Sequence, residues 1–250
     1  MRQATASPSA RAEIRPWPLD ADLAHLVMLD VAMIPTADQV ETWLETTYDT
    51  RLGPDQRIPH RLRTGALYPA AAAAFTECGF EVVDRLALLE RPLIDPLPRR
   101  RQRSSDPAVL RRAHRRDMPA LADLDQLAFD PGWGNDAQSL TDISNATPRS
   151  YRRVAFTTGR GSRVRAGFQI TGQAGATGYI QRLAVHPDAW GRGIGRVLVE
   201  DAVGWLTRRG ANRALVNTGV DNHRALGLYR SAAFDMLDHQ LVVLEHRRAT

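Results

Sequence analysis

Three glycines alternate with other residues at one point of the chain, in the segment HPDAWGRGIG at 186–195. The apolar run YIQRLAV precedes this segment, and RVLVEDAVGWL, whose apolar residues have helical spacing, follows it. A turn that enters a helix presents backbone N–H groups without intrahelical partners, and the helix dipole adds partial positive charge. Glycine lets an anion approach without a Cβ in the way. Gly191, Gly193 and Gly195 therefore predict a phosphate site.

Neither of the common nucleotide motifs fits this turn. A Walker loop ends in Gly-Lys-Ser/Thr, but the sequence contains no lysine. The dinucleotide fingerprint Gly-x-Gly-x-x-Gly is excluded because the glycines are each two residues apart and position 196 is arginine. The phosphate belongs to another class of ligand, and Arg192 or Arg196 is available for a charge-assisted contact.

The segment LAVHPDAWGRGIGRVLVEDAVGWL resembles the acetyl-CoA-binding core of the GNAT acetyltransferase superfamily, whose loop is Gln/Arg-x-x-Gly-x-Gly/Ala. Gly193 and Gly195 match the two glycines, whereas Trp190 stands where glutamine or arginine is usual. Downstream, VNTGVDNHRALGLYRSAAF is similar to the family's Asn-x-x-Ala-x-x-x-Tyr followed by Gly-Phe. The matching residues are Asn222, Ala225, Tyr229 and Phe234, with Ala233 in place of the usual glycine.

The resemblance covers about residues 110–246 and implies the GNAT fold. That fold is of the α/β (α+β) class, with a mixed, mostly antiparallel central sheet flanked by helices. It implies acetyl-CoA as cosubstrate and no metal. Family members splay the fourth strand from the fifth and bind the pantetheine arm along the strand's backbone. The implied cofactor contacts are Leu183, Ala184, Val185, Trp190, Gly191, Arg192, Gly193, Ile194, Gly195, Arg196, Asn222 and Tyr229.

The resemblance also implies an N-acetyltransferase in which a primary amine attacks the thioester directly. An N–H group of Leu183 or Val185 would polarise the thioester carbonyl. Tyr229 matches the tyrosine that protonates the leaving thiolate; its alternative role is packing on an amphipathic helix. Asn222 either touches the CoA arm or caps its helix.

The general base is the weakest part of this interpretation. The strand YIQRLAV carries no carboxylate, so Gln181 is assigned to positioning a water molecule. Asp130 and Asp136 are alternative bases, although both favour solvated surface positions. Trp133 either lines the acceptor pocket or belongs to the core, and His186 is interpreted as structural.

Strands and helices alternate along the chain, which predicts the α/β class independently. Helices are expected at 118–129, with Asp117 as N-cap, from the glycine turn to near Gly210, and at 222–232. The stretch 130–150 is polar and irregular, in part helical. Strands are expected at 109–117, 151–158, 163–171, 177–185, 212–219 and 238–246.

A segment rich in proline, arginine and serine divides the chain into predicted domains. These are 1–98, a linker at 99–108, and a catalytic domain at 109–250. Residues 68–90 resemble 222–244, with Phe80 on Phe234 and Phe75 on Tyr229. We interpret 1–98 as a degenerate partial copy, resembling half a GNAT domain, that lacks the glycine turn. It is expected to bind no CoA and to pack beside the catalytic domain, where it helps shape the acceptor cleft.

The composition is that of a globular protein. The 250 residues are 43% hydrophobic and carry a net charge of +5, and every strongly basic residue is arginine. No apolar run is long enough for a transmembrane helix, and the first residues lack the apolar centre of a signal peptide. A single cysteine, Cys78, argues against a disulfide framework or a Cys-rich zinc site, and is interpreted as a small buried hydrophobe. A cytoplasmic protein without membrane association is expected.

Two other functions are compatible with the sequence. One is a non-catalytic acyl-CoA sensor or scaffold. The other is a nucleic-acid- or ribosome-associated protein, suggested by RRRQR at 99–103 and RRAHRR at 111–116. The lack of interleaved aromatic residues favours a solvated linker over a nucleic-acid surface. The acceptor, a small-molecule or protein amine, and the oligomeric state, with a dimer as one option, are not readable from the sequence.

Overall fold

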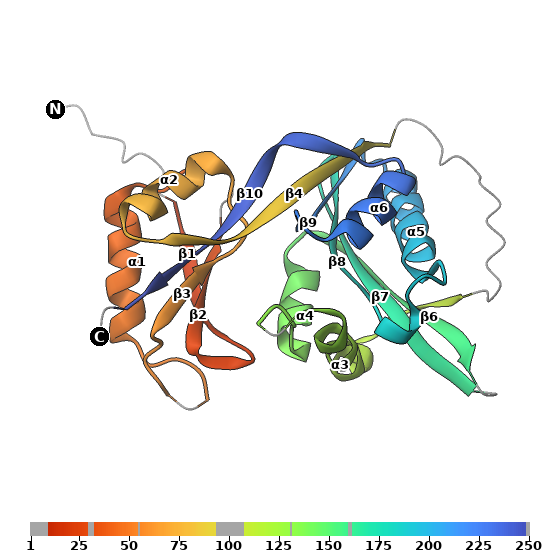
Figure 1. Ribbon diagram of the computed structural model, residues 1–250, viewed down its shortest axis with the longest axis horizontal. Helices are drawn as coiled ribbons and strands as arrows, with labels where there is room; N and C mark the ends of the chain where they lie inside the picture. Colours follow the sequence, from red (N-terminus) through yellow and green to blue (C-terminus); the bar gives the residue numbers. More distant parts are fainter. Residues whose placement is uncertain are drawn as a thin grey trace. The chain divides into compact units, whose positions relative to one another are not determined.

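The computed structural model of the protein describes residues 10–29, 33–54, 56–93, 108–130, 132–159 and 162–248. It divides into two compact units, here called unit 1 (Met1–Ala87 with Asp238–Thr250) and unit 2 (Leu88–Leu237). Two strands run from one unit into the other, β4 (Glu81–Pro92) and β10 (Asp235–Arg247) (Figure 1). Unit 1 therefore consists of two separate stretches of the chain, whereas unit 2 is one continuous stretch.

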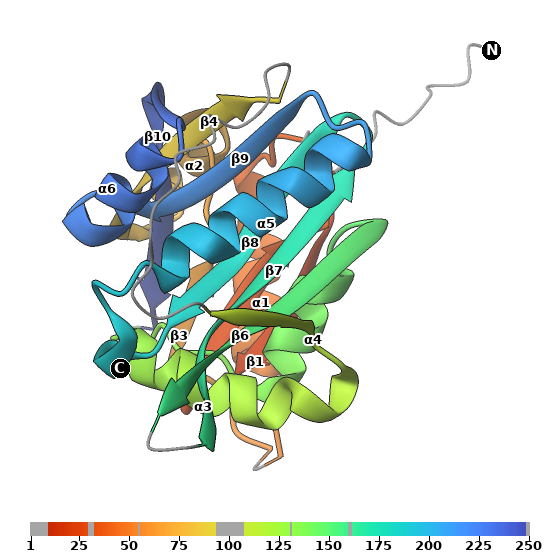
Figure 2. The ribbon, with the colours of Figure 1, turned by 90° about the vertical axis from the view of Figure 1, so that its right-hand side faces the viewer.

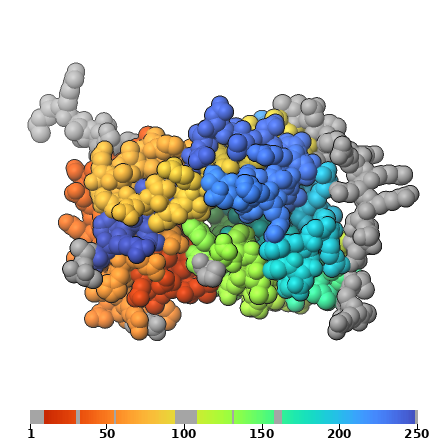
Figure 3. All heavy atoms as spheres, in the orientation of Figure 1, coloured from red at the N-terminus to blue at the C-terminus, as the bar shows by residue number. Residues whose placement is uncertain are grey.

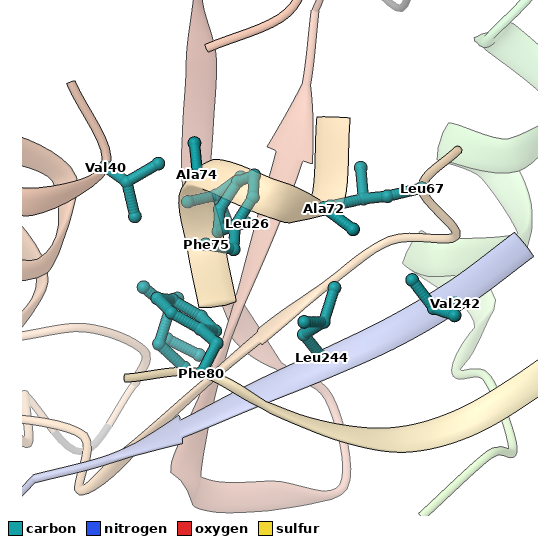
Figure 4. Packing of buried hydrophobic residues seen from close by; sticks show 11 residues of the cluster. Leu26, Val40, Leu67, Ala72, Ala74, Phe75, Phe80, Val242 and Leu244 are labelled. Carbon is teal, nitrogen blue, oxygen red and sulfur yellow. The ribbon is translucent and has the colours of Figure 1, made fainter. Parts of the chain in front are cut away.

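Unit 1 contains one part of a ten-stranded sheet and two helices. Its part of the sheet has the order β1-β2-β3-β10-β4, with β1 and β2 antiparallel, β2 and β3 parallel, and β3 and β10 antiparallel. Its core brings together Phe75, Phe80, Leu26 and Leu244, all at most 3% exposed (Figure 4). The remaining elements of unit 1 are β1 (Ala12–Trp17), β2 (Asp20–Met28), α1 (Ala37–Asp49), β3 (Arg61–Thr64) and α2 (Pro69–Glu77).

Unit 2 contains the larger part of this sheet, of order β4-β9-β8-β7-β6-β5, in which neighbours from β5 to β8 are antiparallel and β8 and β9 are parallel. Its strands are β5 (Val109–Arg112), β6 (Arg149–Gly159), β7 (Ser162–Ala174), β8 (Thr177–Val185) and β9 (Arg213–Gly219). Its helices are α3 (Met118–Ala128), α4 (Ala137–Asn145), α5 (Ile194–Arg208) and α6 (His223–Ser231), with single 3₁₀ turns η1 (Arg115–Asp117) and η2 (Pro187–Ala189).

Helices cover both faces of the sheet of unit 2. Successive residues of a strand point to opposite faces, so neighbouring residues pack against different helices. Val154 packs with α3 and α4, whereas its neighbour Ala155 packs with Ile194 and Leu198 of α5. Figure 2 shows α5 lying across strands β7 and β8. This is a mixed α/β fold with a largely antiparallel central sheet, so the predicted fold class is confirmed.

The elements agree closely with their predicted positions, with two differences. The strand expected at 109–117 ends at Arg112 and is followed by η1. Asp117 is the N-cap residue of α3, as predicted, but its side chain makes no capping hydrogen bond to this helix. Its carboxylate instead accepts hydrogen bonds from Arg111 on the preceding strand and from the backbone N–H of His114.

The two units divide the chain differently from the predicted domains. Residues 88–93 belong to unit 2, and residues 238–248 belong to unit 1, because β4 and β10 each cross over. The predicted linker, 99–108, lies outside the described residues except for Ala108.

The turns that follow α2 and α6 are built alike. Each helix has an aromatic residue two positions before its last residue, and the carbonyl of this aromatic residue accepts the N–H of a phenylalanine five positions later. The N–H of Phe80 donates to Phe75 at 3.1 Å, and that of Phe234 to Tyr229 at 3.0 Å. The residue before the phenylalanine has positive φ in both, +82° at Gly79 and +60° at Ala233. The second turn therefore holds an alanine in a conformation that favours glycine.

Ala233→Gly is expected to raise the free energy of unfolding by about 1 kcal/mol, because it removes a left-handed conformation that costs a Cβ-bearing residue about 1–2 kcal/mol. Urea denaturation measures the change. Ala232→Gly, at the neighbouring position with φ −96°, is the control and should lower stability. An unchanged or lower stability of Ala233→Gly would contradict the strain.

Within the part of the chain that the structure describes, no helix has the length and hydropathy required to cross a bilayer. No cluster of three or more His, Cys, Asp or Glu side chains suited to a metal was found in the same residues. Cys78 is half-buried against the core of unit 1, and burial raises the pKa of its thiol.

Candidate functional site

The glycine turn connects β8 to α5 through η2. Gly191 and Gly193 have φ values of +74° and +79°, and Gly193 is the N-cap of α5. A Cβ built at either glycine meets no protein atom within 4 Å. The turn therefore leaves open space in front of the helix, and Figure 3 shows α5 (cyan) and α6 (blue) at the surface of unit 2.

The N-terminus of α5 has donors available for an anion. Val197 donates to the Gly193 carbonyl at 3.1 Å and begins the helical pattern. The N–H groups of Ile194, Gly195 and Arg196 precede it, and so have no intrahelical acceptor. The N-cap is glycine, which brings no side chain to satisfy them. The helix has 15 residues, so its dipole also favours a negative charge here.

The third glycine and the arginines of the turn have different surroundings. A Cβ at Gly195 would lie 2.9 Å from Cδ2 of Leu228, so this glycine allows α5 to approach α6. Arg196 forms an ion pair with Glu200 at 2.8 Å and donates to the carbonyl of Ser231 at 3.2 Å. Its side chain is thereby held within the protein, whereas Arg192 is exposed on the turn.

β8 separates from β9 before it reaches the turn. The parallel pairing joins Thr177–Tyr179 to Arg213–Leu215, while β8 continues to Val185 and β9 to Gly219. The backbone N–H of His186 donates a hydrogen bond to the Ala166 carbonyl of β7 at 2.9 Å. Because hydrogen-bonded and non-hydrogen-bonded pairs alternate in an antiparallel ladder, the backbone groups of Leu183 and Val185 point away from β7.

This alternation distinguishes the three predicted strand contacts. Leu183 and Val185 present their N–H and C=O groups on the side from which β9 has separated, where the Val185 carbonyl already accepts the indole N–H of Trp190. Ala184 is directed toward Phe168 of β7 and is 2% exposed. Its backbone is therefore used by the sheet, and Leu183 and Val185 are the residues suited to bind an extended ligand.

The side chain of Trp190 connects the glycine turn to strand β8. Its indole Nε1 donates to the Val185 carbonyl at 2.8 Å. The guanidinium carbon of Arg224, in the first turn of α6, lies 3.5 Å from the centroid of the indole ring. Trp190 thus links β8 and α6 at the open end of the separated strands.

α6 carries the predicted Tyr229 and Asn222. Tyr229 is 5% exposed, and burial raises the pKa of its phenol well above the ordinary value, while the positive charge of Arg182 opposes that shift. Asn222 is the N-cap of α6 and accepts the N–H of Ala225 at 3.0 Å. The capping role proposed for Asn222 is therefore present in the structure.

Gln181 occupies an irregularity in the ladder. Ile170 pairs with Arg182 and Thr171 with Ile180, which leaves Gln181 as the extra residue of a β-bulge. Its Oε1 is buried and has no hydrogen-bond donor among the described residues. A buried acceptor of this kind is suited to bind a water molecule or an N–H group.

The other predicted side chains serve local structure. Asp136 caps α4 by accepting the N–H of Ser139 at 2.7 Å. His186 accepts the N–H of Asp188 at 3.2 Å, in agreement with a structural role. Asp130 is exposed, and the Trp133 carbonyl accepts a hydrogen bond from Arg182 at 2.9 Å.

Sequence reasoning missed a buried ion pair between Arg182 and Asp125. The guanidinium binds the carboxylate with two hydrogen bonds of 2.7 and 2.6 Å, and Asp125 is fully buried. The sequence did indicate that Asp125 is buried. It follows Leu121 and Ala122 by four and three positions, which places it on the apolar face of α3. A carboxylate on that face requires a partner.

The comparison with protein families agrees with this geometry. The family described as Acetyltransferase (GNAT) family matches residues 120–234, which include β8, the glycine turn and α6. Residues 120–234 are a domain of the GNAT acetyltransferase family.

Relatives of known structure share this fold. A GCN5-related N-acetyltransferase from Sphaerobacter thermophilus is 17% identical, with a TM-score of 0.63 over 96% of this chain and 76% of that one. A tandem GNAT protein from the clavulanic acid biosynthesis pathway is 13% identical, with a TM-score of 0.63 over 99% of this chain and 82% of that one. At these identities the likeness concerns the fold alone.

A curated relative is similar over a shorter segment. The mycothiol acetyltransferase of Beutenbergia cavernae is 42% identical over 59 residues. That segment is 24% of this chain and only 20% of the relative's length.

Proposed function

We propose that the protein is an acetyl-CoA-dependent N-acetyltransferase whose primary-amine acceptor attacks the thioester directly. The observation that supports this best is the separation of β8 from β9 directly before an open helix N-terminus. A free strand edge leads there into a set of unpartnered N–H groups. An extended amide arm that ends in phosphates has the same order of groups, so the residues fit CoA.

Each part of the site receives one role in this proposal. The N–H groups from Gly191 to Arg196 bind the pyrophosphate, and Leu183 and Val185 bind the pantetheine arm. One of their N–H groups polarises the thioester carbonyl. The amine nitrogen forms a bond to the carbonyl carbon, the carbon–sulfur bond breaks, and Tyr229 supplies a proton to the sulfur.

The amine loses a proton in this reaction, and Gln181 is proposed to position the water molecule that accepts this proton. Its orphan Oε1 accepts a hydrogen bond from a water molecule, which carries the proton away to solvent. Asp136 is less suited to the role of base because its carboxylate already caps α4. The exposed Asp130 has no described contact with the strand.

Unit 1 is proposed to be a degenerate GNAT copy that binds no CoA. The succession β2-α1-β3-α2-β4 repeats β8-α5-β9-α6-β10, with the parallel pairs β2/β3 and β8/β9. The decisive difference is at the first helix. α1 begins at Thr36, whose side chain accepts the N–H of Gln39, while the Gln39 side chain accepts the N–H of Thr36. This capping box satisfies donors that α5 leaves open.

The acceptor is to be found by measuring thiol release from acetyl-CoA with a panel of amines. The panel contains glucosamine, spermidine, an aminoglycoside and a peptide with a free N-terminus. We expect amine-dependent thiol release with at least one compound and acetyl-CoA binding by calorimetry. Binding without thiol release from any amine would favour the acyl-CoA sensor instead.

A further inference from the structure

The segment between α3 and α4 is fastened to β8 by one cluster of buried polar contacts. Arg182 donates two hydrogen bonds to Asp125 and a third to the carbonyl of Trp133 at 2.9 Å. Its guanidinium carbon also lies 3.4 Å from the centroid of the Phe129 ring. We call Asp125, Arg182 and Asn135 the clamp.

Asn135 completes the clamp from within the segment. Its backbone N–H and its side-chain amide both donate to Oδ2 of Asp125, at 2.8 and 3.1 Å. Asp125 thereby receives hydrogen bonds from β8 and from the segment 129–136 at once. A fully buried carboxylate is strongly destabilised without such partners, so the position of the segment depends on this one group.

The clamp lies at the reacting part of β8. Arg182 directly follows the bulged Gln181 and directly precedes Leu183, whose N–H faces the side from which β9 has separated. The charge of Arg182 is also felt at the phenol of Tyr229. Loss of a clamp contact would therefore let residues 132–136 move relative to an acyl group bound along β8.

We propose that Asp125, Arg182 and Asn135 are positioning residues, which hold residues 132–136 of this segment against β8 as one wall of the acceptor side. This inference rests on the proposed acetyltransferase function and concerns the amine rather than the cofactor. The α5 turn, on which the phosphates are proposed to lie, has no described contact with the clamp. The clamp should thus govern the KM for the amine while leaving acetyl-CoA binding nearly unchanged.

The test compares Asp125→Asn, Arg182→Lys and Asn135→Ala in the full chain. With the panel amine of highest kcat/KM as probe, we expect the KM for the amine to rise about 10- to 100-fold in Asp125→Asn. Arg182→Lys keeps the charge but loses the planar fork, so a smaller rise is expected. The Kd of acetyl-CoA should stay within about twofold, since less than about 0.4 kcal/mol is then lost.

A matched ion pair provides the control for a general loss of stability. Arg111 also binds Asp117 with two hydrogen bonds, from Nη1 and Nη2 at 2.9 and 2.9 Å, and Asp117 is 5% exposed. Arg111→Gln is expected to lower the Tm without changing the KM for the amine. An equal rise of KM in Arg111→Gln, or no rise in the clamp variants, would overturn the proposal.

Amide hydrogen exchange of residues 132–136 gives a readout that needs no amine. Exchange there should accelerate on the order of 10-fold in Asn135→Ala and Arg182→Lys, and remain unchanged in Arg111→Gln. Asn135→Ala is included because it leaves the buried charge paired if Asp125→Asn folds poorly. A wild type that releases no thiol with any amine contradicts the proposed function, whereas unchanged exchange contradicts the clamp itself.

Discussion

Tyr229→Phe is expected to lower kcat by about 100-fold or more while the Kd for acetyl-CoA changes by less than about twofold. The substitution removes only the hydroxyl, so packing against Phe234, with ring centroids 5.8 Å apart, is retained. What is lost is the proton that Tyr229 is proposed to give to the departing sulfur. Single-turnover thiol release and calorimetry measure the two quantities separately.

The raised pKa of Tyr229 determines how this loss depends on pH. The buried phenol remains protonated far above neutral pH, so the ratio of wild-type to variant kcat should be constant between about pH 6 and 10. A thiolate formed in the same buried place also has a raised pKa, which keeps proton transfer from the phenol feasible.

The matched control for this variant is Tyr151→Phe. Tyr151 is another tyrosine of unit 2 whose pKa is raised by burial, and its hydroxyl donates to Asp201 at 3.4 Å. Its kcat should equal that of the wild type. If Tyr229→Phe also turns over at the wild-type rate, Tyr229 is not the general acid and serves packing alone.

Gly193→Asp is expected to raise the Kd of acetyl-CoA by at least about 100-fold. An aspartate at φ +79° costs about 1–2 kcal/mol in backbone strain. This strain lowers the stability of the free and the bound protein alike, whereas the carboxylate repels the pyrophosphate only when the cofactor is bound. A rise of about 100-fold in the Kd corresponds to a loss of about 2.7 kcal/mol of binding free energy. A Cβ at this position meets no protein atom within 4 Å, so the side chain would collide with the ligand rather than with the fold.

Gly210→Asp separates strain from ligand contact. Gly210 has φ +75°, equally open surroundings, and a position at the other end of the same helix. We expect a similar loss of Tm in both variants but an unchanged Kd in Gly210→Asp. Acetyl-CoA binding at the wild-type Kd in Gly193→Asp would remove the glycine turn from the phosphate site.

Local patterns predicted the elements that carry the proposed cofactor site. The range 177–185 for β8 is the observed one, because alternating apolar residues are bounded by a turn on one side and by His-Pro on the other. The helix ending near Gly210 was also predicted correctly, since glycine there ends the helix in a left-handed conformation.

Features that depend on distant residues could not be predicted in the same way. Asp125 and Arg182 lie 57 positions apart, and nothing local in the sequence selects this partner among so many arginines. The bulge at Gln181 depends on the register with β7. β4 and β10 each contribute residues to both units, and this too depends on which strands pair. Their apolar patterns do not specify a particular neighbouring strand.

The return of β10 to unit 1 has a consequence for biosynthesis. Most of unit 1 emerges from the ribosome before unit 2, yet it lacks a strand until residues 238–247 have been made. The ribosome must first translate residues 88–237, which takes about 8–30 s at about 5–20 residues per second. During this interval β3 has an unpaired edge, which invites pairing with other chains. Unit 1 is therefore completed only after unit 2 has been synthesised, and a chaperone that covers the edge of β3 would protect it during this interval.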